Sequence, residues 1–262
     1  MQFKAKKSLG QNFLIDQNII DKIVNLIVIK NKSILEIGPG TGNLTTAILK
    51  KNPKKFYVVE KDNSLAELLE KEFGNKLSII NGDILKINEK DISKEKLTVF
   101  GNLPYNISTE IICRWIINLD NLFWFDKLIL MFQKEVADRI LAESDTKNYG
   151  RLSILANWKL DIKKICDVSP ASFSPKPKID SSVLKFEPKK KFYNFKKSSN
   201  LEYITRVFFN HRRKMIKKPF NVIFNGKSEI AEKLNIDLNL RPQNLSLNDY
   251  FLLTEEYEKL TS

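Results

Sequence analysis

A five-residue turn, Gly101-Asn102-Leu103-Pro104-Tyr105, places an amide, a rigid proline and an aromatic ring side by side. An apolar, β-prone run precedes it and a helical pattern follows, which predicts a position at the carboxyl end of a strand, where open α/β sheets bind ligands. Pro104 fixes φ and lacks an N–H, so Asn102 and the Leu103 carbonyl are expected to present acceptors beside a stacking face from Tyr105. This group suits a flat heterocycle with an exocyclic amine. By itself, however, the turn favours a structural role around a buried tyrosine.

A glycine loop, residues 38–42, ends another apolar strand and opens a helix. Its Gly-x-Gly-x-Gly spacing differs from that of dinucleotide binders and suits close backbone approach to a ligand without a pyrophosphate. Glu36, Glu60 and Asp83 end or adjoin neighbouring strands and predict an acidic pocket, which favours a cation such as the sulfonium of S-adenosylmethionine. Glu60 is positioned to accept ribose hydroxyls. Asp83 would accept the adenine amine, with Ile84 packed on the ring.

Elements that position these residues alternate along the first 150 residues. Short apolar strands separated by helical patterns predict a Rossmann-like parallel sheet wound on both faces. The expected strands are 33–37, 56–59, 77–80, 97–100 and 127–132, and the expected helices lie after Asp16, up to Lys50, and at 64–73, 109–119 and 134–143. Two further strands, 161–168 and 182–187, have no crossover helix between them and are expected to pair antiparallel at the sheet edge.

The remaining chain predicts a second domain. Helical patterns at 201–216, 228–234 and 246–260 follow a basic linker, so we expect an α/β domain over 1–188 and a small all-α domain over 189–262. The net charge is +13, and residues 188–218 hold eleven Lys or Arg against the single acid Glu202. Such clustering predicts a polyanionic partner, either nucleic acid or an anionic membrane.

Composition also narrows the chemistry. His211 is the sole histidine, which argues against His-based metal sites and Ser/His triads, and no metal site is expected. Cys113 and Cys166 are far apart and predict buried, reduced thiols in a cytoplasmic protein. No apolar stretch is long enough to span a bilayer, and no apolar segment follows the basic first residues as a signal peptide would require.

The chain resembles the ribosomal RNA adenine dimethyltransferases almost from end to end. The motifs that carry the resemblance are 7–14 (KSLGQNFL), 35–42 (LEIGPGTG), 102–105 (NLPY), 173–181 (FSPKPKIDS) and 211–214 (HRRK). Two positions depart from the family pattern: Lys176 replaces a commoner proline, and His211 stands where glutamine is expected. The first bears on the rigidity of its loop and the second on RNA contact.

The resemblance implies S-adenosylmethionine-dependent N6,N6-dimethylation of two adjacent adenines near the 3′ end of small-subunit rRNA, within an immature subunit, by a monomer. Phe173 would cover the target base opposite Tyr105. The implied cofactor contacts are Asn12, Leu14, Gly38, Glu60, Asp83 and Asn102. RNA phosphates would be held by a basic arm and by a basic helix of the second domain, with the candidates Lys4, Lys6, Lys7, Arg212, Arg213 and Lys214.

Three other functions remain open from the residues. A large-subunit rRNA methyltransferase of the antibiotic-resistance type shares the fold and a similar catalytic motif. A non-catalytic ribosome-assembly or transcription factor built on this fold is the second, and the intact 102–105 turn argues against it. A dinucleotide-dependent dehydrogenase is disfavoured by the glycine spacing and by Asp83.

Overall fold

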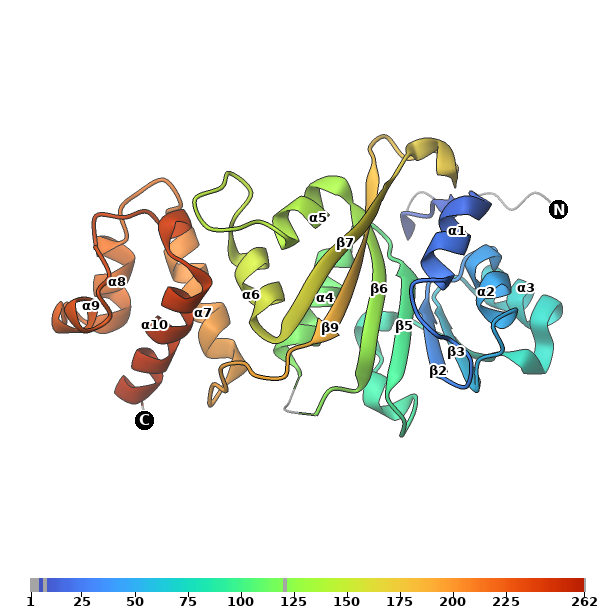
Figure 1. Ribbon diagram of the computed structural model, residues 1–262, viewed down its shortest axis with the longest axis horizontal. Helices are drawn as coiled ribbons and strands as arrows, with labels where there is room; N and C mark the ends of the chain where they lie inside the picture. Colours follow the sequence, from blue (N-terminus) through green and yellow to red (C-terminus); the bar gives the residue numbers. More distant parts are fainter. Residues whose placement is uncertain (1–4, 7–8, 120–121, 262) are drawn as a thin grey trace. The chain divides into compact units, whose positions relative to one another are not determined.

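The computed structural model describes residues 5–6, 9–119 and 122–261 (Figure 1). The chain forms two compact units: one from segments within 1–111, 120–137 and 162–188, the other from 112–119, 138–161 and 189–262. The second unit thus takes two segments from before the expected boundary, and the division at residue 188 into two domains stays a prediction.

The strands of the described chain are β1 (Phe13–Leu14), β2 (Ser33–Ile37), β3 (Lys55–Glu60), β4 (Ser78–Asn81), β5 (Leu97–Asn102), β6 (Phe125–Gln133), β7 (Leu160–Val168), β8 (Phe173–Ser174) and β9 (Ser181–Pro188). The α-helices are α1 (Gln17–Val24), α2 (Asn43–Leu49), α3 (Asn63–Phe73), α4 (Ser108–Ile117), α5 (Lys134–Ile140), α6 (Arg151–Lys159), α7 (Ser198–Phe209), α8 (Lys217–Phe224), α9 (Glu229–Lys233) and α10 (Leu247–Leu260). Every strand predicted from the sequence is present, with ends shifted by at most two residues.

Among the described residues, seven strands form one sheet in the order β4-β3-β2-β5-β6-β9-β7. β2 pairs in parallel with β3 and β5, and parallel pairing continues outward to β4 and β6. β9 runs antiparallel to β6 and β7 lies beyond it at the edge. The predicted Rossmann-like sheet with an antiparallel edge is therefore confirmed, as is the helical C-terminal region.

Helices α1 and α2 close one face of this sheet because their apolar stripes meet alternate strand positions. Asp16 caps α1 through its side chain, which accepts the N–H groups of Asn18 and Ile19 as the sequence predicted. The buried cluster takes alternate residues from the strands, as the pleat requires: Phe56 and Val58 from β3, Phe100 from β5, Ile129 and Met131 from β6.

The helices differ from the prediction in two places. Residues 151–159 form α6, for which the sequence predicts no element. Its residues are nearly all buried, on every side of the helix, so they show no amphipathic period. The single helix expected over 201–216 is wrong, because α7 ends at Phe209 and α8 begins at Lys217. Pro219 accounts for the start of α8, because a proline is tolerated only in the first turn of a helix; residues 210–213 form a turn and do not continue α7.

In the second unit, α7 packs against α10. Phe208 and Tyr250 meet edge to face, and Tyr250 donates its hydroxyl to the Pro242 carbonyl at 2.7 Å. Within the described chain, no helix is both long and apolar enough to cross a membrane.

Candidate active site

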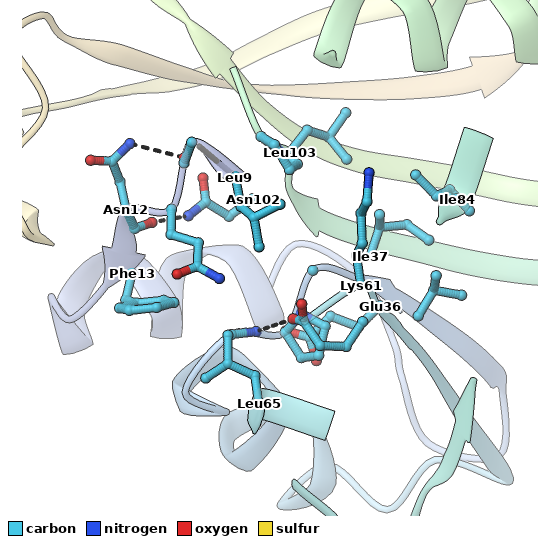
Figure 2. A pocket seen from close by; sticks show the side chains of 18 of the residues that line it. Leu9, Asn12, Phe13, Glu36, Ile37, Lys61, Leu65, Ile84, Asn102 and Leu103 are labelled. Atoms are coloured by element: carbon cyan, nitrogen blue, oxygen red, sulfur yellow. Dashed lines mark hydrogen bonds between the residues drawn. The ribbon is translucent and has the colours of Figure 1, made fainter. Parts of the chain in front are cut away.

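A pocket opens where β2, β3 and β5 end, because the carboxyl ends of parallel strands meet at one edge of the sheet (Figure 2). The arm at 9–14 and the β5–α4 turn at 102–107 complete its wall. The predicted site residues that line it are Asn12, Leu14, Gly38, Glu60, Asp83, Ile84, Asn102, Leu103, Pro104 and Tyr105. Ten predicted site residues, which come from five separate segments of the chain, therefore line the same pocket.

The glycine loop does not bind anions through its N–H groups, since all three glycine donors are engaged within the protein. Gly38 donates to the Val59 carbonyl at 2.9 Å, Gly42 donates to the Pro39 carbonyl at 3.0 Å, and Gly40 donates to Glu60 Oε2 at 3.2 Å. The loop therefore holds the Glu60 carboxylate and leaves no nest for a pyrophosphate. This arrangement argues against the dehydrogenase alternative.

Besides its hydrogen bond to Glu60, Gly40 is constrained by the arm, which packs against it. Its φ is +59°, and a Cβ there would lie 2.6 Å from Cδ1 of Phe13. Gly226 provides a comparison, because its φ of +76° is equally restrictive but a Cβ there would meet nothing within 4 Å. Glycine at 40 is thus required by both backbone conformation and contact with the arm.

We expect Gly40→Ala to displace the arm as well as strain the loop. Both Gly40→Ala and Gly226→Ala should incur the cost of a left-handed residue, about 1–2 kcal/mol, but only the first should also weaken S-adenosylmethionine binding. Thermal unfolding and calorimetric titration of the two variants measure these effects. Equal cofactor affinity in both variants would contradict the assigned contact.

The acids of the pocket carry less charge than the sequence predicted. Burial raises the pKa of Glu36 to about 8, and the neighbouring Glu60 charge acts in the same direction, against a 2.7 Å hydrogen bond from Thr45 Oγ1. Burial also raises the pKa of Glu60, opposed by the N–H groups of Asp62 and Gly40. Glu36 is therefore mostly a neutral acid at pH 7.

Asp83 is ionised but locally neutralised. Lys61 Nζ lies 2.8 Å from its Oδ2, and this hydrogen bond holds the pKa of Asp83 below its usual value. The other carboxylate oxygen accepts the N–H of Leu85 at 3.0 Å. Ile84, 5% exposed, follows directly and lines the pocket. The negative charge expected in the pocket from the sequence is thus partly balanced by Lys61, which was not among the predicted site residues.

The amide of Asn102 is oriented by the arm. Its Nδ2 donates to the backbone carbonyl of Asn12 at 2.7 Å (Figure 2). Because the N–H end of the amide is engaged there, Oδ1 is left as the acceptor end. Asn102 lines the pocket, its role as the substrate acceptor stays a prediction, and Asn12 contributes its main-chain carbonyl.

Tyr105 is half-buried beside this amide, and its hydroxyl lies 2.5 Å from Ser181 Oγ at the start of β9. Burial raises the pKa of the Tyr105 phenol, against that hydrogen bond, so the ring remains neutral. Contact with Ser181 at the hydroxyl end restricts the ring at its far edge. Its face is therefore held as part of the pocket wall.

The structure does not place Phe173 in the pocket. Its ring is 1% exposed and belongs to the apolar core with Leu14, Val168 and Val183. The physical reason is a short antiparallel pairing of β1 with β8, in which Leu14 lies opposite Phe173. Phe173 could cover a base only if this strand pair opened. In this structure it is a core residue, and the expectation that it covers the target base is not met.

The predicted RNA contacts differ in their surroundings. Lys6 pairs with Asp62 at 2.8 Å, while Lys4 and Lys7 lie outside the described residues. The segment expected as a basic helix is a turn between α7 and α8, closed by a 2.8 Å hydrogen bond from the Lys214 N–H to the His211 carbonyl.

Within that turn, Arg212 is half-buried and binds its own unit. Its guanidinium donates to Gln243 Oε1 at 3.3 Å and to the Lys147 carbonyl. Arg213 and Lys214 are exposed. Only these two residues of the predicted trio therefore present their charges outward.

Two residues that contribute to the site were missed. Gln11 lines the pocket, and Asp62, whose side chain is 2% exposed, holds the arm through Gln11 and Lys6. Gln11 lies within the 7–14 motif and precedes Asn12, a predicted cofactor contact. Asp62 had only its position two residues after Glu60 as a signal. Among the described residues, no three His, Cys, Asp or Glu side chains are grouped to hold a metal ion.

Known proteins with similar sequences are ribosomal RNA methyltransferases. A family model described as ribosomal RNA adenine dimethylase matches residues 2–259. The ribosomal RNA small subunit methyltransferase A of Pelagibacter ubique (strain HTCC1062) is 64% identical over 260 residues, which cover 99% of each chain.

Two solved structures share the fold. A dimethyladenosine transferase from Plasmodium falciparum superposes with a TM-score of 0.81 at 29% identity, covering 94% of this chain and 98% of that one. The 23S rRNA methyltransferase ErmE superposes with a TM-score of 0.70 at 20% identity over 93% of this chain and 98% of its own, a likeness of fold alone. From the match of the family model over nearly all its residues and from its close relatives, we conclude that this chain belongs to the ribosomal RNA adenine dimethylase family.

Proposed function

We propose that this enzyme transfers methyl groups from S-adenosylmethionine to the N6 amines of two adjacent adenines near the 3′ end of small-subunit rRNA, with Asn102 as the acceptor that orients each amine. The observation that carries the proposal is the 2.7 Å hydrogen bond from Asn102 Nδ2 to the Asn12 carbonyl, which leaves Oδ1 as an acceptor in the pocket. The 64% identity to a small-subunit methyltransferase favours this substrate over large-subunit rRNA.

The donor set of the pocket fits the adenosine part of S-adenosylmethionine. Each Glu60 oxygen accepts one backbone N–H, from Gly40 or Asp62, and retains lone pairs for two ribose hydroxyls. Asp83 offers carboxylate oxygens beside the apolar wall of Ile84, which suits an adenine edge and face. We assign these residues, with Gly38 and Leu14, to cofactor binding. When bound there, S-adenosylmethionine supplies an electrophilic methyl group.

The chain's own residues act on the target amine. The lone pair of an adenine amine is delocalised into the ring, which makes it a poor nucleophile. Acceptance of its two N–H bonds by Asn102 Oδ1 and the Leu103 carbonyl draws the nitrogen toward tetrahedral geometry and frees the lone pair. Pro104 contributes no competing donor. As the new N–C bond forms, the methyl–sulfur bond breaks and the nitrogen becomes a cation, which then loses one N6 proton to solvent. The site therefore works by orientation and acceptor placement, and a strong base is unnecessary.

Tyr105 would receive the face of the base. An adenine must leave its stack to enter the pocket, at a cost of a few kcal/mol, and stacking on an aromatic ring returns about 1–3 kcal/mol. The hydroxyl contact with Ser181 at 2.5 Å restrains the Tyr105 ring before the base arrives. We further propose that the enzyme acts as a monomer in the cytoplasm on an immature small subunit.

Transfer of labelled methyl groups to immature small subunits tests the function directly. We expect label in N6,N6-dimethyladenosine at two neighbouring positions near the 3′ end of the small-subunit rRNA, mapped by mass spectrometry. Fully mature, methylated subunits serve as the control acceptor and should take up no label. Label confined to large-subunit rRNA, or its absence from all RNA, would refute the proposal.

Substitutions in the basic turn at 211–214 should affect the binding of RNA and leave the binding of S-adenosylmethionine unchanged. We expect Arg213→Glu with Lys214→Glu to weaken rRNA binding and to lower the salt dependence by about two phosphate contacts. Affinity for S-adenosylmethionine should be unchanged. Arg212→Ala is the companion variant and should lower thermal stability, because its guanidinium holds Gln243 and Lys147. Filter binding over a salt series, with unfolding curves, measures both; an unaltered salt slope in the double variant would contradict the assignment.

A further inference from the structure

The arm is fastened to the end of β3 by one buried carboxylate. Asp62 Oδ1 lies 2.8 Å from Lys6 Nζ, and Asp62 Oδ2 accepts a hydrogen bond from Gln11 Nε2 at 3.0 Å. The other end of the Gln11 amide, Oε1, accepts the backbone N–H of Lys6 at 2.7 Å. Gln11 thus uses both ends of its amide, so its orientation is fixed. We call Lys6, Gln11 and Asp62 the arm latch.

The arm latch adjoins both halves of the active site. On one side, the Asp62 N–H donates to Glu60 Oε1 at 2.9 Å, and Glu60 is the proposed ribose acceptor. On the other, Gln11 is followed directly by Asn12, whose carbonyl accepts from Asn102 Nδ2. The main chain therefore links a residue gripped by Asp62 to the atom that orients the Asn102 amide.

The orientation of that amide decides what the target amine meets. With Nδ2 on the Asn12 carbonyl, Oδ1 is the acceptor in the pocket. If the carbonyl moves away, the amide is free to rotate, and its NH₂ end would then oppose the N–H groups of an adenine amine. A donor facing a donor leaves both groups unpaired, which is costly.

We propose that Gln11 and Asp62 are positioning residues for methyl transfer: they hold the arm so that the Asn12 carbonyl keeps the Asn102 amide with Oδ1 facing the substrate. The inference rests on the proposed role of Asn102. It adds a specific coupling, in which the β3 end that binds the cofactor also sets the catalytic amide of β5.

The variants must spare the second role of Asp62, which caps α3 by accepting the Ser64 N–H at 3.1 Å. Asp62→Asn preserves the cap, because asparagine caps a helix about as well as aspartate, but the NH₂ it introduces would oppose the Gln11 NH₂. Gln11→Glu instead places two carboxylates face to face. In the double variant Gln11→Glu/Asp62→Asn, the new amide can donate to the new carboxylate, which restores the contact with donor and acceptor exchanged.

Single-turnover methyl transfer at saturating cofactor and RNA, together with the side-chain ¹⁵N–¹H resonances of Asn102, tests the latch. We expect each single variant to lower the rate about tenfold or more, to shift or broaden the Asn102 amide signals, and to keep the unfolding temperature. The double variant should regain most of the rate and the signals. Gln17→Glu is the matched control, because Gln17 Nε2 donates to Asp21 at 2.8 Å on an exposed helix face; it should match the wild type.

Wild-type rates and unshifted Asn102 signals in both single variants would overturn the latch, as would a double variant no faster than the singles. Asn102→Ala separates this failure from that of the function. If Asn102→Ala is inactive while the latch variants are fully active, only the latch is refuted. If Asn102→Ala retains full activity, the proposed role of Asn102 falls, and the latch falls with it.

Discussion

Asn102→Ala is expected to lower the methyl-transfer rate by about 10³-fold or more, because it removes the acceptor that orients the target amine in the transition state. Affinity for S-adenosylmethionine should change by no more than about threefold, since Glu60 and Asp83 lie on other strand ends. Rapid-quench measurement of the transfer step and calorimetric titration of the cofactor give the two quantities separately.

Two further variants sharpen this prediction. Asn102→Asp keeps an acceptor but loses the N–H that binds the Asn12 carbonyl, so its rate should fall between those of the wild type and the alanine variant. Asn106→Ala removes the same side chain four residues later, from an exposed position in the same pocket wall, and should leave the rate within about threefold. Comparable rates in Asn102→Ala and Asn106→Ala would refute the assignment.

The meeting of Asn102, Glu60 and Asp83 could be predicted because it follows from one rule of topology. Each residue ends or follows a short apolar strand, the strands alternate with helices, and parallel strands place their carboxyl ends at one edge. The alternation of side chains along each strand also helped to predict which residues face the core. Residues that approach because of this regularity are accessible to sequence reasoning.

Contacts that depend on irregular chain could not be predicted. β1 and β8 are two-residue strands separated by about 160 residues, and no periodicity announces their pairing, which buries Phe173. The contact between Gln11 and Asp62 likewise joins a loop to the residue before a helix. Pro219 is different: its presence signals the start of α8 in the sequence, although it does not predict that α7 ends at Phe209.

Charge states form a third class, because they depend on burial. Glu36 and Glu60 look like equivalent strand-end acids in the sequence. In the structure Glu36 is 2% exposed and accepts a hydrogen bond from the Thr45 hydroxyl, whereas Glu60 accepts two backbone N–H groups. No spacing rule shows which of two such acids burial will keep neutral, so the sequence overstated the negative charge of the pocket.

The neutral state of Glu36 predicts a strong dependence of stability on pH. Its pKa is about 8 in the folded protein, against a usual value of 4.5, principally because burial disfavours the carboxylate. Between these two values the folded state retains a proton that the unfolded state has released. The free energy of unfolding should therefore fall as pH rises from about 4.5 to about 8, by up to roughly 5 kcal/mol from this group.

Glu36→Gln isolates this contribution, because the amide matches the shape of the neutral acid and does not titrate. Urea unfolding at several pH values between 5 and 9 should show a steeper decline for the wild type than for the variant, with the two curves diverging as Glu36 is forced to ionise. Asp167 and Glu187, whose pKa values are lowered to about 2 by hydrogen bonds from Lys164 and Lys185, titrate below this window and cancel in the comparison. Parallel curves would mean that Glu36 is already ionised at neutral pH, and that the cofactor meets a buried negative charge behind the glycine loop.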